Sequence, residues 1–238
     1  MATYVISDIH GEYDKFMELL ELIKFSDSDT LYILGDILDR GPHPIKVMLK
    51  LMKMPNVIPL VGNHEVMAID CLRFLMKEIT ESSISDIDRY MLEKLLNWEY
   101  NGCKTTLAEF NSVGRETRQA IVDYIKDFSL YEKVEAGGRK YLLVHAGLGN
   151  FRPDRALYEY DLNELVWERP DYNVRYFKNM YTVTGHTPTE LIKDNDRPGY
   201  IYRKEGHIAI DCGACFGGRL AALCLDTDEE FYSSGGIL

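Results

Sequence analysis

Short apolar runs alternate with amphipathic stretches along the first part of the chain. The runs at residues 3–7, 30–34 and 56–61 are almost continuously hydrophobic, as expected of strands that are buried on both faces. Between them, residues 12–25 and 42–54 carry apolar side chains at the spacing of a helix that covers a core. This order of strands and helices predicts a parallel sheet that is at least partly covered by helices.

The rest of the chain divides into a helical part and a second set of strands. Residues 66–128 show mostly helical periodicity, and strand patterns return at residue 131 with a hairpin that turns at Gly137 and Gly138. No repeat, low-complexity tract or linker rich in proline and serine interrupts the sequence. We therefore predict a single domain over residues 1–238, with a mostly helical insertion at about residues 66–128.

Composition and charge narrow the class of protein. The 238 residues suffice for a sizeable core, and the formal net charge of −11 gives no general attraction to nucleic acid or anionic membranes. No apolar run approaches the ~18 residues of a membrane span, and the N-terminal residues lack the pattern of a signal peptide. The five cysteines are odd in number and unevenly spaced, as in a reduced protein. We expect a cytoplasmic protein without nucleic-acid or membrane partners, and the oligomeric state is left open.

Residues that bind metals follow five of the predicted strands. They are Asp8 and His10, Asp36, Asn63 and His64, His145, and His186. In an open α/β sheet, ligands bind just outside the carboxyl ends of the strands. Four of the six histidines lie in these turns, and their mixture of oxygen and imidazole donors suits Mn²⁺, Fe²⁺, Co²⁺ or Zn²⁺. These turns contain no cysteine, which argues against a structural zinc site.

The motifs SDIHG, GDILDRG, GNHE, HAG and GHT, in this order, resemble those of the PPP-type phosphatases of the calcineurin-like metallophosphoesterase superfamily. The resemblance runs from residue 4 to about residue 225. Ser7 stands where the first motif usually has glycine, and residues 66–130 are not diagnostic, but neither departure changes a ligand. The implied fold class is α/β, with two mixed sheets packed face to face as a sandwich and helices outside.

The resemblance also implies a cofactor of two divalent transition-metal ions, with Mn²⁺ expected and Fe or Zn as alternatives. Asp8, His10 and Asp36 would hold the first ion, and Asp36, Asn63, His145 and His186 the second. A bridging carboxylate such as Asp36 offsets the repulsion between two dications about 3.5–4 Å apart. A hydroxide held between the ions would attack phosphorus directly.

A proton donor for the leaving group is implied at His64. Asp39 would accept a hydrogen bond from His64, fix its tautomer and raise its pKa, so that the imidazole carries the proton. The simpler interpretation of Asp39 is a helix-capping carboxylate or a partner in a surface ion pair.

Substrate binding is implied at three side chains. Arg40 would hold phosphate oxygens through its fork of donors, together with the ligand Asn63. Arg169, in the segment LVWERP, is the candidate for a second guanidinium, and its alternative is a surface arginine before a proline turn. Arg219 either contacts substrate or projects from a strand.

Two phosphoester substrates fit these motifs. A bacterial-type serine/threonine protein phosphatase is favoured, because Asp39 and His64 are both present and residues 62–70 resemble that group. The alternative is a symmetrical diadenosine tetraphosphate (bis(5′-nucleosyl)-tetraphosphate) hydrolase, which residues 2–36 also resemble, although that group usually has aspartate where this chain has Glu65. The third interpretation, an inactive metal-binding module, is disfavoured by the complete set of ligands. The expected partner is therefore a phosphorylated protein or a small phosphoester.

Overall fold

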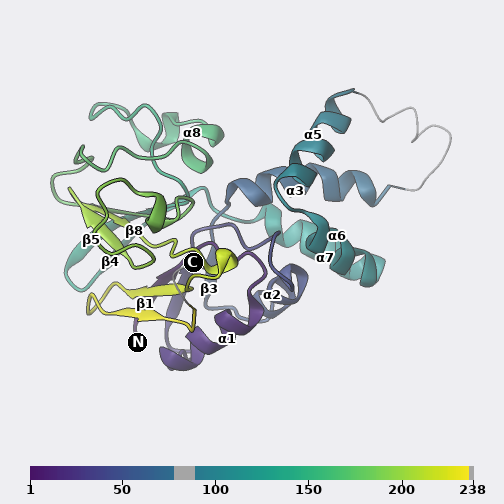
Figure 1. The fold of residues 1–238 in the computed structure, drawn as a ribbon, viewed down its shortest axis with the longest axis horizontal. Coiled ribbons are helices and arrows are strands. Elements are labelled where there is room, and N and C mark those ends of the chain that lie inside the picture. The colour runs from purple at the N-terminus through teal and green to yellow at the C-terminus, as the bar shows by residue number, and fades with distance from the viewer. Residues whose placement is uncertain (78–88, 236–238) are drawn as a thin grey trace.

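The computed structural model describes residues 1–77 and 89–235, and its two sheets lie side by side in Figure 1. The first sheet has the order β10-β9-β1-β2-β3, and the second has the order β4-β5-β6-β8-β7. In the first sheet, these strands span Glu230–Tyr232, Ala221–Cys224, Thr3–Ile6, Thr30–Ile33 and Val57–Pro59. In the second sheet, they span Tyr131–Ala136, Arg139–Val144, Tyr181–Thr184, His207–Ala209 and Tyr202–Lys204.

Both sheets are mixed, as predicted. Strands β1, β2 and β3 are parallel, and β9 runs antiparallel to both β1 and β10. Strands β5, β6 and β8 are parallel, with β4 and β7 antiparallel at the two edges. The predicted hairpin is β4–β5, which turns at Gly137 and Gly138. The sequence pattern misses β7 and β10, because these short edge strands, YRK and EFY, contain charged residues and form no apolar run.

The central strands are largely apolar because both faces of each sheet are covered, whereas the edge strand β4 carries charged residues at partly or fully exposed positions. Successive side chains of a strand point to opposite faces. Val5 of β1 and Leu143 of β5 share the core cluster between the sheets. The next residue, Ile6, packs with α1 (Tyr13–Leu22) and α2 (Pro44–Leu51), whereas Val144 packs with α8 (Leu162–Val166). The result is the predicted sandwich with helices outside.

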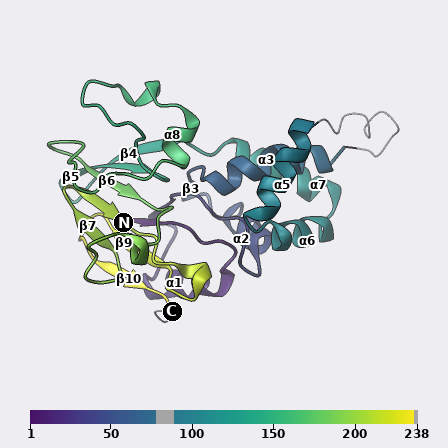
Figure 2. The same cartoon turned by 45° about the horizontal axis from the view of Figure 1, so that its top comes forward.

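The helical part lies to one side of the sheets, as Figures 1 and 2 both show. It consists of α3 (Asn63–Leu75), α5 (Arg89–Tyr100), α6 (Lys104–Ser112) and α7 (Arg115–Lys126). It starts at Asn63 rather than near residue 66. Trp98 and Phe110 belong to the same core cluster as Ile33 of β2, so these helices share a core with the first sheet. The extent of the domain itself stays a prediction.

Short 3₁₀ helices at Leu157–Glu159, Thr189–Leu191 and Ala214–Phe216 complete the secondary structure of the described ranges. Among the helices in these ranges, none combines the length and the hydrophobicity that a transmembrane span requires.

Candidate metal centre and active site

The turns that follow the parallel strands meet between the two sheets, around the carboxylate of Asp36. Its Oδ2 atom lies 3.5 Å from Nε2 of His10, which follows β1 of the first sheet. Its Oδ1 atom lies 3.4 Å from Nε2 of His145, which follows β5 of the second sheet. One carboxylate therefore faces an imidazole from each sheet, as expected for the predicted bridging ligand.

Asn63 and His186 complete the group on the His145 side. Oδ1 of Asn63 lies 2.9 Å from Nε2 of His145 and 2.9 Å from Nδ1 of His186. Ligand atoms of Asp36, His145 and His186 all lie within 4.8 Å of one another, and so do those of His10, Asp36 and His64. The structure thus brings together all four side chains that the sequence assigns to the second ion.

The buried histidines present the correct nitrogen to a metal. Nδ1 of His10 donates to the carbonyl of Leu38 at 2.8 Å, and Nδ1 of His145 donates to the carbonyl of Leu34 at 2.5 Å. A donating Nδ1 leaves the lone pair of Nε2 directed at Asp36. Burial lowers the pKa of both imidazoles well below their usual value, which favours the neutral form that binds metals.

Asp8 contacts the candidate centre at His186. Its carboxylate accepts the backbone N–H of His186 at 3.0 and 3.2 Å and the hydroxyl of Ser7. Ser7 therefore contacts a candidate ligand, whereas the sequence analysis expected this departure from the motif to leave the ligands unaffected. Asp8 is not in the two tightest groups of donors, so its place as a ligand stays a prediction.

Asp211 is a buried carboxyl that the sequence analysis missed. Burial raises its pKa well above the usual value, and the charge of Asp8 adds to this effect. Burial and neighbouring carboxylates likewise raise the pKa values of Asp8 and Asp36. Buried carboxyls that repel one another are stabilised as carboxylates by a cation between them, so the donor set fits divalent metals. The signal was available in the sequence, because Asp211 follows strand β8 and stands two residues before Gly213.

The candidate ligands require an unusual backbone. Asp8, His10, Asp36 and His186 have φ values of 51°, 43°, 52° and 63°. Residues other than glycine rarely adopt this left-handed conformation, and each instance costs on the order of 1–3 kcal/mol. The turns therefore hold their shape only because the surrounding structure supports them.

Glu65, in the first turn of α3, supplies much of that support. Its buried carboxylate accepts the backbone N–H groups of Asp36 at 2.8 Å, Ile37 at 2.9 Å, Leu38 at 3.1 Å and Gly62 at 3.0 Å. It thereby ties the loop after β2 to the loop after β3. Gly62 is required at this point, because a Cβ atom there would lie 2.2 Å from Oδ1 of Asp36.

His64 and Asp39 form the predicted pair. Nδ1 of His64 lies 2.6 Å from Oδ2 of Asp39, and both side chains are fully buried, so Asp39 is neither a cap nor part of a surface ion pair. Asp39 also accepts hydrogen bonds from Trp98 and Thr106, two residues that the sequence analysis missed. Sequence patterns carry no signal for them.

The pKa of His64 differs from the sequence-based expectation. Burial, followed by the charge of Arg40, lowers this pKa well below its usual value, whereas the sequence analysis expected Asp39 to raise it. Desolvation of a fully buried imidazole outweighs the carboxylate. Burial also raises the pKa of Asp39 to about 7, against the hydrogen bonds from Thr106 and Trp98.

The three predicted arginines occupy different positions. Arg40 is exposed, and its Nη1 donates to Nε2 of His10 at 2.7 Å. Arg169 is exposed on the His186 side, where burial lowers the pKa of His186 to about 4 and the charge of Arg169 adds to that effect. Arg219 lies over the ring of Tyr200 at 4.7 Å, which favours its interpretation as a packing residue.

The model of the calcineurin-like phosphoesterase family matches residues 1–217. The chain belongs to this family. Metallophosphoesterases use divalent metals, in agreement with the two groups of donors around Asp36.

Several relatives of this calcineurin-like phosphoesterase are named as nucleotide hydrolases. The asymmetrical bis(5′-nucleosyl)-tetraphosphatase PrpE of Halalkalibacterium halodurans is 27% identical over 92% of this chain and 88% of its own length. The symmetrical bis(5′-nucleosyl)-tetraphosphatase of Acidovorax ebreus is 31% identical over 62% of this chain and 44% of its own length.

Two solved structures share the fold. One, provisionally named as a diadenosine tetraphosphatase, has a TM-score of 0.67 at 18% identity and covers 99% of this chain and 94% of its own. A protein serine/threonine phosphatase from Saccharomyces cerevisiae has a TM-score of 0.56 at 14% identity. The match covers 100% of this chain and 80% of that one. At these identities the likeness shows the fold alone.

The first prediction concerns metal content. We expect this phosphoesterase to bind two divalent ions per chain, one for each group of donors, when it is dialysed against Mn²⁺. Asp36→Asn should lower the occupancy of both sites, because Asp36 faces both groups, whereas His186→Ala should lower mainly one. Elemental analysis measures the stoichiometry, and full occupancy in Asp36→Asn would contradict the bridging role.

The second prediction concerns Glu65. In Glu65→Gln, the amide NH₂ must face backbone N–H groups, so buried donors lose their acceptor at roughly 1–3 kcal/mol each. The free energy of unfolding should fall by about 2–5 kcal/mol in urea titrations with a chelator present. The control is Glu21→Gln at an exposed position of α1, which should stay within about 0.5 kcal/mol of the wild type. Equal stability of the two variants would be incompatible with this role of Glu65.

Proposed function

We propose that this protein hydrolyses phosphoester or phosphoanhydride bonds at a dinuclear metal centre. The observation that carries the proposal is the placement of Asp36, whose two oxygens face His10 and His145 from opposite sheets. Bound divalent ions would polarise phosphoryl oxygens and lower the pKa of a coordinated water. The side chains that would hold the ions are Asp8, His10, Asp36, Asn63, His145 and His186.

The other polar side chains then bind and orient the substrate. Arg40 and Arg169 are exposed guanidinium groups; Arg40 contacts His10, and the charge of Arg169 helps to lower the pKa of His186. They would grip phosphate oxygens from both sides, which gives a local attraction for anions on a chain whose net charge is −11. The amide NH₂ of Asn63 would add a donor, since its Oδ1 already faces the two histidines.

His64 would deliver the proton to the leaving group. Its Nε2 is buried, has no hydrogen-bond partner among the described residues and lies 3.9 Å from Oδ2 of Asp36. Its Nδ1 is held by Asp39, so the ring is fixed with Nε2 directed at the centre. A phosphate dianion beside Nε2 would favour the charged imidazolium and so oppose the effect of burial.

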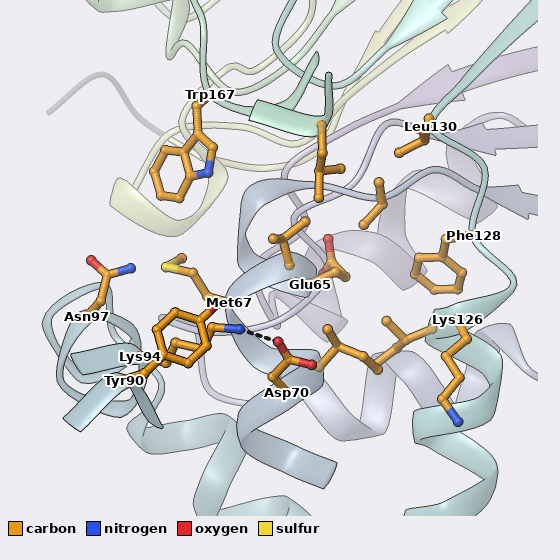
Figure 3. Close-up of a pocket in the computed structure, with 15 residues that line it drawn as sticks. Glu65, Met67, Asp70, Tyr90, Lys94, Asn97, Lys126, Phe128, Leu130 and Trp167 are labelled. Atoms are coloured by element: carbon orange, nitrogen blue, oxygen red, sulfur yellow. Dashed lines mark hydrogen bonds and ion pairs between the residues drawn. The ribbon is translucent and has the colours of Figure 1, made fainter. Parts of the chain in front are cut away.

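A dinucleoside tetraphosphate is the substrate that we favour. The relative that aligns over most of both chains is named as a hydrolase of such compounds, which shifts the preference away from the protein phosphatase favoured by the motifs alone. A cavity of about 530 Å³ between α3, α5, α7 and α8 gives further support (Figure 3). Its lining includes Trp167, Tyr90 and Phe128, and such aromatic, largely apolar surfaces suit nucleobases.

Trp167 places this cavity next to the candidate centre. Its ring meets that of His186 edge to face, with 6.1 Å between the ring centroids. In Figure 3, Trp167 faces Asn97 and Met67 across the cavity. A phosphate bound at the centre could therefore extend to a nucleoside in this cavity, with Trp167 between the two.

A phosphoserine or phosphothreonine protein is the second candidate substrate, and the His64–Asp39 pair favours it. A serine alkoxide needs a proton as it leaves, whereas a nucleoside polyphosphate departs readily without one. His64 and Asp39 are fully buried, with 2.6 Å between Nδ1 and Oδ2. A proton donor held in this way would therefore accelerate the cleavage of an ester more than the cleavage of an anhydride.

The third prediction compares these substrates directly. Protein that has been stripped with a chelator should be inactive and should recover with Mn²⁺. It should then turn over diadenosine tetraphosphate with a higher kcat/KM than a phosphoserine peptide or a phosphotyrosine peptide. Chromatography distinguishes symmetrical cleavage, which gives ADP alone, from asymmetrical cleavage, which gives ATP and AMP. Faster phosphopeptide turnover would reverse the preference, and inactivity on every substrate with both ions bound would refute the proposed function.

The fourth prediction tests the cavity. Trp167→Ala should raise KM for diadenosine tetraphosphate about fivefold or more beyond any change in KM for p-nitrophenyl phosphate, since stacking on a base contributes ~1–3 kcal/mol. The control is Tyr158→Ala, because Tyr158 is an aromatic residue that is 83% exposed and does not line the cavity. Metal content is measured in both variants. Equal shifts of KM for the two substrates would exclude a nucleoside site at Trp167.

A further inference from the structure

The helical part of the chain forms hydrogen bonds with the turn that carries Asp39 and Arg40. Thr106 of α6 donates its hydroxyl to Oδ1 of Asp39 at 2.6 Å and accepts the N–H of Asp39 at 2.9 Å. Trp98 of α5 donates its indole N–H to Oδ2 of Asp39 at 2.7 Å. Gly102, between these helices, accepts the N–H of Arg40 at 3.0 Å. We call Trp98, Gly102 and Thr106 the α5–α6 clamp.

The turn needs this clamp to keep its shape. Asp39 and Arg40 have φ values of 72° and 66°, and two successive left-handed residues other than glycine are costly. Asp39, Trp98 and Thr106 are all fully buried, so water does not replace the hydrogen bonds that the clamp makes. The strand before the turn and the helix after it provide no side chain that bonds the carboxylate of Asp39.

The clamp also determines which carboxylate oxygen of Asp39 is hydrogen-bonded to His64. Thr106 occupies Oδ1 of Asp39, and Trp98 shares Oδ2 with Nδ1 of His64. Both hydrogen bonds of the clamp favour the carboxylate form of Asp39, and a carboxylate accepts from Nδ1–H of His64. The imidazole is thereby held in the orientation that directs Nε2 at Asp36.

We propose that Trp98, Gly102 and Thr106 are positioning residues for the leaving-group proton, which act by holding Asp39 against His64. The inference rests on the proposed phosphoesterase function and adds a task for the helical part of the chain. The hydrogen bonds of the three residues to this turn go to Asp39 and to the backbone N–H of Arg40, not to the candidate metal ligands. Their loss should therefore affect substrates that need a proton more than substrates that do not.

The chain offers a matched pair of variants. Thr106→Val removes the hydroxyl that bonds Asp39 and keeps the shape of the side chain. Thr105→Val makes the same change one residue earlier, where the hydroxyl is buried and has no partner among the described residues. Thr106→Ser keeps the hydroxyl and should restore wild-type behaviour. Trp98→Phe removes the indole N–H while keeping an aromatic ring.

The measurement is kcat on phenyl phosphate, whose leaving group is poor, and on p-nitrophenyl phosphate, whose leaving group departs without a proton. General acid catalysis contributes roughly 10²–10⁴-fold, so a displaced acid should lose about tenfold or more on phenyl phosphate. We expect this selective loss in Thr106→Val and Trp98→Phe and not in Thr105→Val. In a His64→Asn background, Thr106→Val should cause no further loss, because the two residues act as a unit.

Equal slowing of both esters by Thr106→Val, or the same loss in the His64→Asn background, would make the clamp structural only.

A second measurement does not depend on turnover. The Nδ1–H signal of His64 in ¹H–¹⁵N spectra should shift in Thr106→Val and stay in place in Thr105→Val, and an unchanged signal in both would overturn the proposal. If the wild type hydrolyses neither ester with both ions bound, the spectra alone decide the role of the clamp, and turnover of diadenosine tetraphosphate and the phosphopeptides decides the proposed function. Should Thr106→Val not fold, Trp98→Phe takes its place.

Discussion

The buried carboxylate of Glu65 is the interaction on which the candidate centre depends. It joins two loops that end adjacent parallel strands, and it accepts four backbone N–H groups that would otherwise be buried without partners. The left-handed conformation of Asp36 persists within this set of bonds. The same charge raises the pKa of Asp36, after burial itself, so the backbone is stabilised at an electrostatic cost.

That electrostatic cost explains why the site suits cations. Asp8, Asp36 and Asp211 are buried close enough to raise one another's pKa values, while the nearby imidazoles are held neutral. Carboxylates and neutral imidazoles together form a donor set for divalent transition metals. Arg40 and Arg169 add positive charge at exposed positions, where an anionic substrate would meet it first.

The two departures from the family pattern both reach the site. Ser7 donates its hydroxyl to Asp8, and the helical part supplies Trp98 and Thr106 to Asp39. The aromatic cavity also lies among these helices and α8. The sheet edges thus bring together the candidate metal ligands, and the helices beside them supply the groups that we propose to orient the acid and to select the substrate.

The sequence by itself determined the order of strands and helices and the residues gathered at the strand ends, because periodicity and strand-end position are local properties. Asp8, His10, Asp36, Asn63, His145 and His186 could all be named in this way. The mixed sandwich followed only from the resemblance of the motifs to a known family. Tertiary structure alone decided the rest. Trp98 and Thr106 lie 59 and 67 residues from Asp39 along the chain, and no local pattern connects such distant positions. The sequence also could not predict that the pKa of His64 is lowered. Desolvation depends on every atom packed around the ring, whatever its place in the sequence.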